Sequence, residues 1–133
     1  MKIRHLDHVA IRVSDVKRSV DWYQRVLKLA RFSPPEWEGV PVFLMAGDTG
    51  IAIFPASEAD NRTALQRQGI GIDHFAFNVP LDELEDVKAH YDKEGIKYRF
   101  SDHIFYHSID THDPDGHTVE VTAATGIKPA QIA

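Results

Sequence analysis

The chain has 133 residues, of which 43% are hydrophobic and 26% charged, as is typical of one soluble globular domain. Its 15 Lys and Arg against 20 Asp and Glu give a formal net charge of −5, and the absence of a basic stripe argues against a nucleic-acid partner. The lack of cysteine excludes disulfides and thiolate ligands. No apolar run approaches the ~20 residues that are needed to cross a bilayer. We therefore expect a cytoplasmic protein without a membrane partner.

The first predicted strand, residues 8–13 (HVAIRV), alternates apolar and polar side chains. Because successive side chains on a strand point to opposite faces, His8 and Arg12 share a face that Ile11 does not. A helix is predicted next, with Ser14 as its N-cap. Its apolar stripe at helical spacing consists of Val16, Val20, Tyr23 and Leu27.

Two further strands are predicted at residues 40–47 (VPVFLMAG) and 50–56 (GIAIFPA), joined by a turn at AGDTG. The Pro-rich segment before them, RFSPPEWEGVP, contains Trp37 and fits either a rim over a binding site or a plain surface loop. The polar stretch at about 58–70 predicts the connection to a second half of the chain.

The second half begins with HFAFNV, residues 74–79, in which His74 again lies opposite an apolar face. Pro80 can open a helix and Gly95 suits the position after its end. Three more strands are predicted at residues 96–100, 107–112 and 117–123, with DPDG as the turn before the last.

The order β-α-β-β-β therefore occurs twice, and predicts one α+β domain in which two modules form a cupped mixed sheet. We expect module 1 at about 1–57, a linker at about 58–70, module 2 at about 71–125, and a C-terminal tail. Amphipathic strand–helix pairs are common enough to look alike by chance, but the shared D-H-x-A core in LDHVAI and IDHFAF favours a true repeat.

Glu120, in the last predicted strand, lies by alternation on the same kind of face as His8 and His74. A carboxylate there is costly to desolvate, and two neutral imidazoles supply no charge, so a divalent cation would resolve the conflict. Two nitrogens and one carboxylate leave coordination positions open, which favours Fe(II) or Mn(II) over Zn, Ni or Co. The residual positive charge would favour a small substrate that is anionic or chelating.

Five segments give the chain its resemblance to a known family: LDHVAI, SVDWYQRVLKL, IDHFAF, EGIKY and DPDGHTVEV. In this order and approximate spacing they resemble the vicinal oxygen chelate superfamily, which includes glyoxalases, bleomycin-resistance proteins and extradiol dioxygenases. The resemblance implies paired modules around a metal site with His8, His74 and Glu120 as ligands. It also implies a substrate bound through vicinal oxygens, and dioxygenase-type or lyase/isomerase chemistry.

Two departures from the family patterns narrow the expected set of metal ligands and the expected reaction. Glyoxalase I is similar but has a second Glu ligand in the last strand of its first module. In this sequence that position holds Ile53, or Ala52 if the register slips by one, and neither residue is a carboxylate. A three-ligand site is therefore expected. The C-terminal run is similar to that of extradiol dioxygenases, but Asp110 replaces their tyrosine and cannot donate as a phenol does while ionised. In this run His103 is a candidate acid–base group, and Tyr106, His107 and Asp110 are further catalytic candidates.

Two other functions stay open at the sequence level. One is a non-catalytic drug-binding protein, which would need no metal ligands, and the other is an epoxide-opening enzyme similar to fosfomycin-resistance proteins. We expect a homodimer, because open sheet edges favour a symmetric partner. The site can be formed within one chain or across a dimer that exchanges modules.

Overall fold

The computed structural model describes residues 1–60, 62 and 69–128, so most of the predicted linker and the end of the tail lie outside the described residues. The chain divides into two compact units. Unit 1 comprises Met1–Leu65 with Asp113–Asp115, and unit 2 comprises Gln66–His112 with Gly116–Ala133. Within the described part of the chain, no helix is long and apolar enough to cross a membrane.

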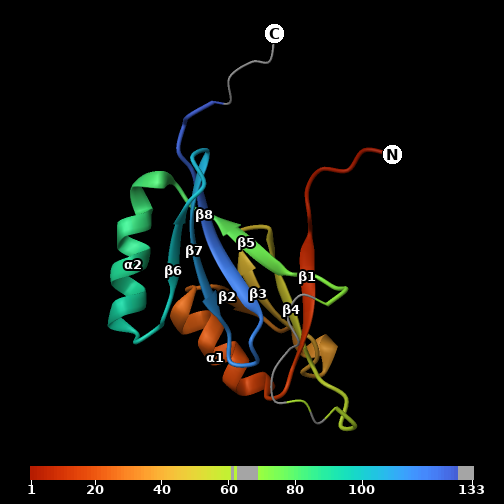
Figure 1. The fold of residues 1–133 in the computed structure, drawn as a ribbon. Coiled ribbons are helices and arrows are strands. Elements are labelled where there is room, and N and C mark those ends of the chain that lie inside the picture. The colour runs from red at the N-terminus through yellow and green to blue at the C-terminus, as the bar shows by residue number, and fades with distance from the viewer. Residues whose placement is uncertain (61, 63–68, 129–133) are drawn as a thin grey trace. The chain divides into compact units, whose positions relative to one another are not determined.

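Unit 1 consists of one mixed four-stranded sheet and its helix (Figure 1). The strand order is β1-β4-β3-β2, with β1 parallel to β4 and the other neighbours antiparallel. The elements are β1 (His8–Val13), α1 (Val16–Val26), β2 (Ala30–Phe32), the 3-10 turn η1 (Pro35–Trp37), β3 (Val42–Ala46) and β4 (Thr49–Pro55).

Unit 2 repeats this topology with the order β5-β8-β7-β6, in which β5 is parallel to β8. Its helix α2 runs alongside β6 (Figure 1). The elements are β5 (His74–Asn78), η2 (Leu81–Glu83), α2 (Leu84–Lys93), β6 (Arg99–Asp102), β7 (Tyr106–His112) and β8 (Thr118–Ala124). The predicted α+β repeat is therefore confirmed.

Three local predictions need correction. The N-cap of α1 is Asp15, whose side chain accepts from the Arg18 N–H, while Ser14 bonds to Asp115 instead. The second helix begins as the 3-10 turn η2 before α2. The short strand β2 was not predicted, because its three residues are all exposed and carry no burial alternation.

Each sheet has a helix side and an opposite face. In unit 1 the helix side is formed by buried apolar residues that pack with α1: Ile11, Val13, Val42, Leu44, Ile51 and Ile53. The register places His8, Ala10 and Arg12 on the opposite face. In unit 2, Ile109, Val119 and Val121 lie on the helix side, and His74, Asp110 and Glu120 lie opposite.

The turn at residues 113–115 belongs to unit 1, although the strands on either side of it belong to unit 2. The fully buried Tyr23 donates its hydroxyl to Asp113 Oδ2 at 2.7 Å. Burial, together with the charge of Asp113, raises the pKa of Tyr23. This hydrogen bond satisfies a buried carboxyl group and so fixes the turn that leads into β8.

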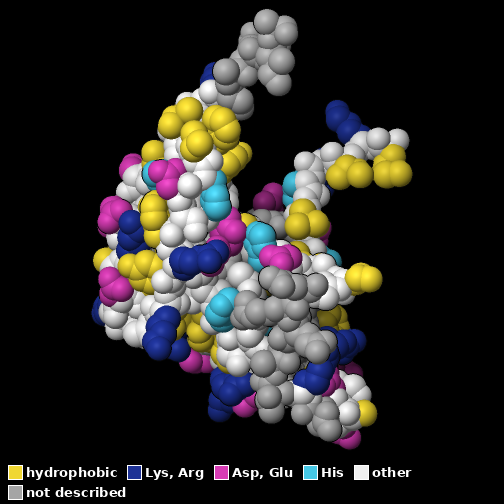
Figure 2. Space-filling view, in the orientation of Figure 1, with side chains coloured by type: hydrophobic (Ala, Val, Ile, Leu, Met, Phe, Trp, Pro, Cys, Tyr) yellow, Lys and Arg dark blue, Asp and Glu magenta, His cyan; other side chains and the backbone are white. Residues whose placement is uncertain are grey.

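Exposed hydrophobic side chains gather where β8 leads into the C-terminal segment (Figure 2), namely Ile104, Phe105, Tyr106 and Ile127. The turn between β6 and β7, which carries Ile104 and Phe105, is closed by backbone bonds, with the His103 N–H donating to the Tyr106 carbonyl at 2.8 Å. The Thr125 hydroxyl also donates to the Ile104 carbonyl at 2.7 Å. These bonds fix the place of His103 in unit 2.

We predict that Tyr23→Phe lowers the free energy of unfolding by about 1–3 kcal/mol, because Asp113 would lose its buried hydrogen-bond donor. Tyr91→Phe is a matched control, since Tyr91 is equally buried but its hydroxyl has no hydrogen-bond partner. Removing that hydroxyl should leave stability unchanged or raise it. Urea unfolding measures both variants, and equal losses would contradict the assigned role of Tyr23.

Candidate functional site

His8 is the first residue of β1, on the face opposite α1. Its Nδ1 lies 2.8 Å from Asp7 Oδ2, and the hydrogen bond lowers the pKa of Asp7. Because the carboxylate accepts the Nδ1–H, the neutral imidazole carries its lone pair on Nε2. A histidine held in this way is prepared to bind a metal ion through Nε2.

His74 repeats this arrangement as the first residue of β5. Its Nδ1 lies 2.7 Å from Asp73 Oδ1, and the side chains of His8 and His74 are almost equally exposed, at 41% and 42%. The hydrogen bond to Asp73 is the main reason why the pKa of His74 is raised. Asp7 and Asp73 were not predicted as site residues, although the D-H dipeptide occurs in both copies of the repeat.

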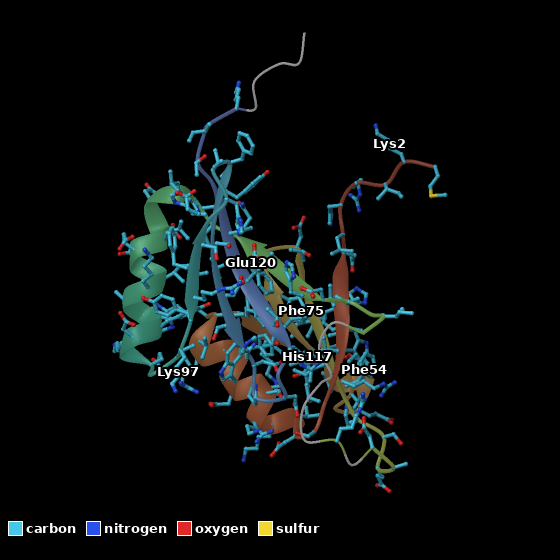
Figure 3. All side chains as sticks on the ribbon, in the orientation of Figure 1. Lys2, Phe54, Phe75, Lys97, His117 and Glu120 are labelled. Atoms are coloured by element: carbon cyan, nitrogen blue, oxygen red, sulfur yellow. The ribbon has the colours of Figure 1, made fainter. Side chains whose placement is uncertain are left out.

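Glu120 lies on β8 (Figure 3), and its Oε2 is 3.1 Å from His74 Nε2. Its direct cross-strand partner is Asp110 on β7, so the two carboxyl groups lie side by side on one face of the sheet. Burial, and then the charge of Asp110, raise the pKa of Glu120. Unit 2 thus brings together one imidazole and two carboxyl groups.

The other three catalytic candidates occupy different positions in unit 2. His103 is close enough to Glu120 for its charge to favour the ionised carboxylate. Tyr106 lies on the same face of β7 as Asp110 and is half-exposed. His107 lies on the helix side, where its ring contacts Phe100 and its Nε2 is 3.4 Å from Asp102. The structure therefore does not bring His107 together with Glu120.

The register also settles which residue of unit 1 corresponds to Glu120. Glu120 pairs with Ala76, two residues beyond His74, just as Ala52 pairs with Ala10, two residues beyond His8. Ala52, rather than Ile53, is the equivalent position, and Ile53 lies on the helix side. Unit 1 therefore supplies no carboxylate at the position equivalent to Glu120.

Among the described residues, no group of three or more His, Asp or Glu side chains is arranged to hold a metal ion. His74 and Glu120 are in contact within unit 2, whereas His8 belongs to unit 1. The contacts that bear on metal binding are therefore local ones: the two histidine–aspartate pairs, and the contact of Glu120 with His74.

An aromatic cluster lies beside His8 in unit 1, and it includes Trp37 of the Pro-rich segment that was predicted as either a rim over a binding site or a plain surface loop. The ring of Phe43 is 5.1 Å from His8, Trp37 is 5.3 Å from Phe43, and Phe32 is 5.4 Å from Trp37. Phe32 and Trp37 remain exposed, so these rings form an accessible apolar surface next to the imidazole.

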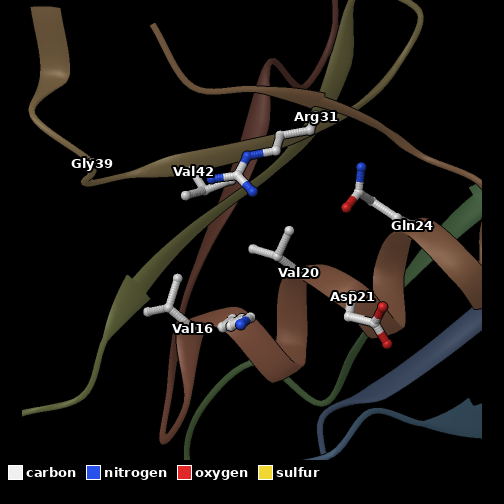
Figure 4. Close-up of a pocket in the computed structure, with 8 residues that line it drawn as sticks. Val16, Val20, Asp21, Gln24, Arg31, Gly39 and Val42 are labelled. Atoms are coloured by element: carbon white, nitrogen blue, oxygen red, sulfur yellow. The ribbon is translucent and has the colours of Figure 1, made fainter. Parts of the chain in front are cut away.

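A separate cavity of about 540 Å³ lies on the helix side of unit 1 (Figure 4). Its lining includes Asp21 and Gln24 from α1, and Arg31 and Val42 from the strands. Because the register places Arg31 beside Leu44 on the helix side, this cavity does not adjoin the face that carries His8.

We predict that Asp73→Asn lowers the pKa of His74 toward ~6.5, because the hydrogen bond that stabilises the imidazolium is weakened. The raised pKa stabilises the folded state fully below ~6.5, and this contribution is lost as the pH rises through the raised value. NMR titration of chelator-treated protein measures the shift, with Asp92→Asn on α2 as a charge-matched control. An unchanged pKa in Asp73→Asn would contradict the assignment.

Comparison with known proteins agrees with this fold. One curated relative, "Glutathione transferase FosA" of Serratia marcescens, is 25% identical over 122 residues, which cover 90% of this chain and 80% of that protein.

Two solved structures share the fold. Lactoylglutathione lyase from Agrobacterium tumefaciens has a TM-score of 0.72 at 22% identity and covers 96% of this chain and 100% of its own. The fosfomycin resistance protein FosX from Listeria monocytogenes has a TM-score of 0.71 at 19% identity, and the match covers 94% of this chain and 97% of the FosX chain. A family model also matches residues 5–121, and the chain therefore belongs to the Glyoxalase/Bleomycin resistance protein/Dioxygenase superfamily.

Proposed function

We propose that this protein is a metal-dependent enzyme that acts on a small substrate bound through vicinal oxygens. The observation that carries the proposal is the repeated aspartate–histidine pair at the start of β1 and of β5, with Glu120 in contact with the second histidine. His8, His74 and Glu120 are the proposed ligands. Relatives that include enzymes support the assignment of catalysis.

The donor set fits a divalent metal ion. Both histidines have Nδ1 engaged by a carboxylate, so each would bind the metal through Nε2; the Nε2 of His74 lies 3.1 Å from Glu120 Oε2, and Glu120 supplies one negative charge. Nitrogen and oxygen donors with open positions favour Fe(II) or Mn(II), with Zn, Ni and Co as alternatives. Members of the superfamily typically use divalent metals. The bound ion would supply Lewis acidity toward the substrate oxygens.

The chain's own residues would bind the substrate and move its protons. His103 lies within electrostatic reach of Glu120, so we assign it the acid–base role. Tyr106 shares the face of Asp110 and can donate its hydroxyl to a substrate oxygen. His107 is left out of the proposed machinery, because it lies on the helix side.

The aromatic cluster of Phe32, Trp37 and Phe43 would bind the apolar part of the substrate. Its ring contact with His8 places an apolar surface directly beside one proposed ligand. The backbone bonds of η1, in which the Trp37 N–H donates to the Pro34 carbonyl at 3.0 Å, hold this ring in place. A preorganised surface of this kind binds flat apolar groups at low entropic cost.

Epoxide opening by thiol addition is the second candidate, and the similarity to FosA favours it. In this reaction a sulfur–carbon bond forms, an epoxide carbon–oxygen bond breaks, and the released oxygen takes up a proton. Ring-cleaving dioxygenation is less well supported, because Asp110 stands where the resemblance calls for a tyrosine. A drug-binding protein without catalysis would leave both aspartate–histidine pairs unexplained.

The proposed ligands belong to both units, and we propose a homodimer in which the centre is formed either within one chain or by an exchange of modules between chains. The two sheets have the same topology, so in a homodimer a unit of one chain can pack against a unit of the second chain. A monomer in solution would exclude an exchange of modules between chains.

We predict that the chelator-treated protein binds one Mn²⁺ per chain, and that His8→Ala, His74→Ala and Glu120→Ala each weaken binding by about tenfold or more. Isothermal titration calorimetry measures the affinities, with His90→Ala on α2 as the control. Unchanged affinity in all three variants would remove the metal centre from the proposal.

We predict turnover with one of three substrate classes that match the candidate chemistries. They are fosfomycin with glutathione, a hemithioacetal of glutathione, and a catechol with Fe(II) under oxygen. Mass spectrometry follows the first two and oxygen uptake the third, and His74→Ala should abolish the activity. Metal binding without turnover in any class would instead favour a binding protein.

A further inference from the structure

The cavity on the helix side of unit 1 has an apolar floor that belongs to the packed core. Val16 and Val20 from α1 and Val42 from β3 line it, and Figure 4 shows both helix valines pointing toward the strands. Val20 and Val42 are only 4% and 1% exposed, so the core fixes their positions. The volume of about 540 Å³ lies within the ~300–1,000 Å³ of pockets that bind small molecules. The cavity can therefore hold a small apolar body on a rigid surface.

Two cationic side chains, Lys17 of α1 and Arg31 of β2, line the same cavity. The Arg31 Nε–H donates to Ser33 Oγ at 2.9 Å, which orients the guanidinium and leaves both of its Nη groups available to a ligand. In the part of the chain that the structure describes, no carboxylate forms an ion pair with Arg31 or Lys17. The positive charge of the cavity is therefore not neutralised within these residues.

Asp21 of α1 supplies the carboxylate of the lining. Its Oδ2 lies 3.6 Å from Arg25 Nε, one turn along the helix, and both side chains are exposed, so this ion pair is weak. Counted in full, Asp21 reduces the charge of the two lining cations to a net +1, whereas the whole chain carries −5. A local positive excess on a chain of negative net charge favours an anionic ligand at this place.

Ligands of other kinds would use only part of this lining. A neutral apolar molecule would displace water from Arg31 and Lys17 without giving their N–H groups an acceptor, which costs free energy. A bare inorganic anion would contact the two cations but leave the valine floor uncovered. An organic anion that carries one carboxylate on an apolar body would satisfy both parts of the lining.

We propose that this cavity is a binding site for a small organic anion, whose carboxylate accepts hydrogen bonds from Arg31 while its apolar body lies on Val20 and Val42. The guanidinium can donate two parallel hydrogen bonds to a planar carboxylate, and Lys17 adds a second positive charge. Arg31 and Phe32 are consecutive residues of β2, so the cavity and the aromatic cluster lie on opposite faces of this strand. The site is therefore separate from the proposed metal centre, and its ligand would not compete with the substrate of that centre.

The test is a titration of the chelator-treated full chain with naphthoate, followed through the valine methyl signals in NMR spectra. We expect the signals of Val16, Val20 and Val42 to shift and to saturate with a Kd of about 1 mM or tighter. Arg31→Gln should weaken binding about tenfold, because it removes the charged fork. Lys93→Gln, an equal charge change on the exposed surface of α2, should leave the Kd unchanged. Uncharged naphthamide and the small anion acetate should each bind about tenfold more weakly than naphthoate.

Several results would overturn the proposal. Valine methyl signals that do not move, or shifts confined to Trp37 and Phe43, would mean that naphthoate does not occupy the cavity. Equal Kd values for naphthoate and naphthamide, or an unchanged Kd in Arg31→Gln, would leave only an unspecific apolar surface, and equally tight binding of acetate would leave an adventitious ion only. Circular dichroism establishes that each variant is folded. Because no metal is present in the titration, its outcome is independent of the proposed metal centre.

Discussion

Parallel pairing between the first and last strand of each unit is the constraint on which the rest depends. Two parallel strands cannot be joined by a tight turn, so the chain must cross over through a helix and two further strands. This crossover gives each sheet a helix side and an opposite face. The same pairing aligns the residue two positions beyond each histidine with Ala52 in unit 1 and with Glu120 in unit 2.

The two units keep this framework but differ in the chemistry of the face opposite the helix. In unit 1 the position paired with His8 is Gly50, where an added Cβ would lie 2.3 Å from the Leu44 carbonyl oxygen. Glycine there lets β3 approach closely, and Phe43 then contacts His8. In unit 2 the equivalent row carries Thr118, and the next row carries Glu120 and Asp110. One face is aromatic and the other polar.

The polar face of unit 2 carries an energetic cost that suggests function. Burial and the neighbouring Asp110 raise the pKa of Glu120, and the imidazole of His74, 3.1 Å from Glu120 Oε2, offsets only part of this effect. Natural proteins retain such groups where a ligand compensates them, so stability is reduced in exchange for binding. The contrast with Tyr23 and Asp113, a fully satisfied buried pair, shows that this sequence can satisfy carboxyl groups elsewhere.

The sequence by itself determined the repeat, the strand faces and the positions of His8, His74 and Glu120, because a period of two depends only on local alternation. It also indicated that unit 1 lacks a second carboxylate. Only the tertiary structure decided that Ala52 is the equivalent of Glu120, and that Asp110 lies beside Glu120 while His107 lies on the helix side. Those facts depend on the pairing of strands distant in sequence, which no local pattern specifies. The orientation of both histidines by Asp7 and Asp73 likewise required side-chain positions that spacing alone does not give.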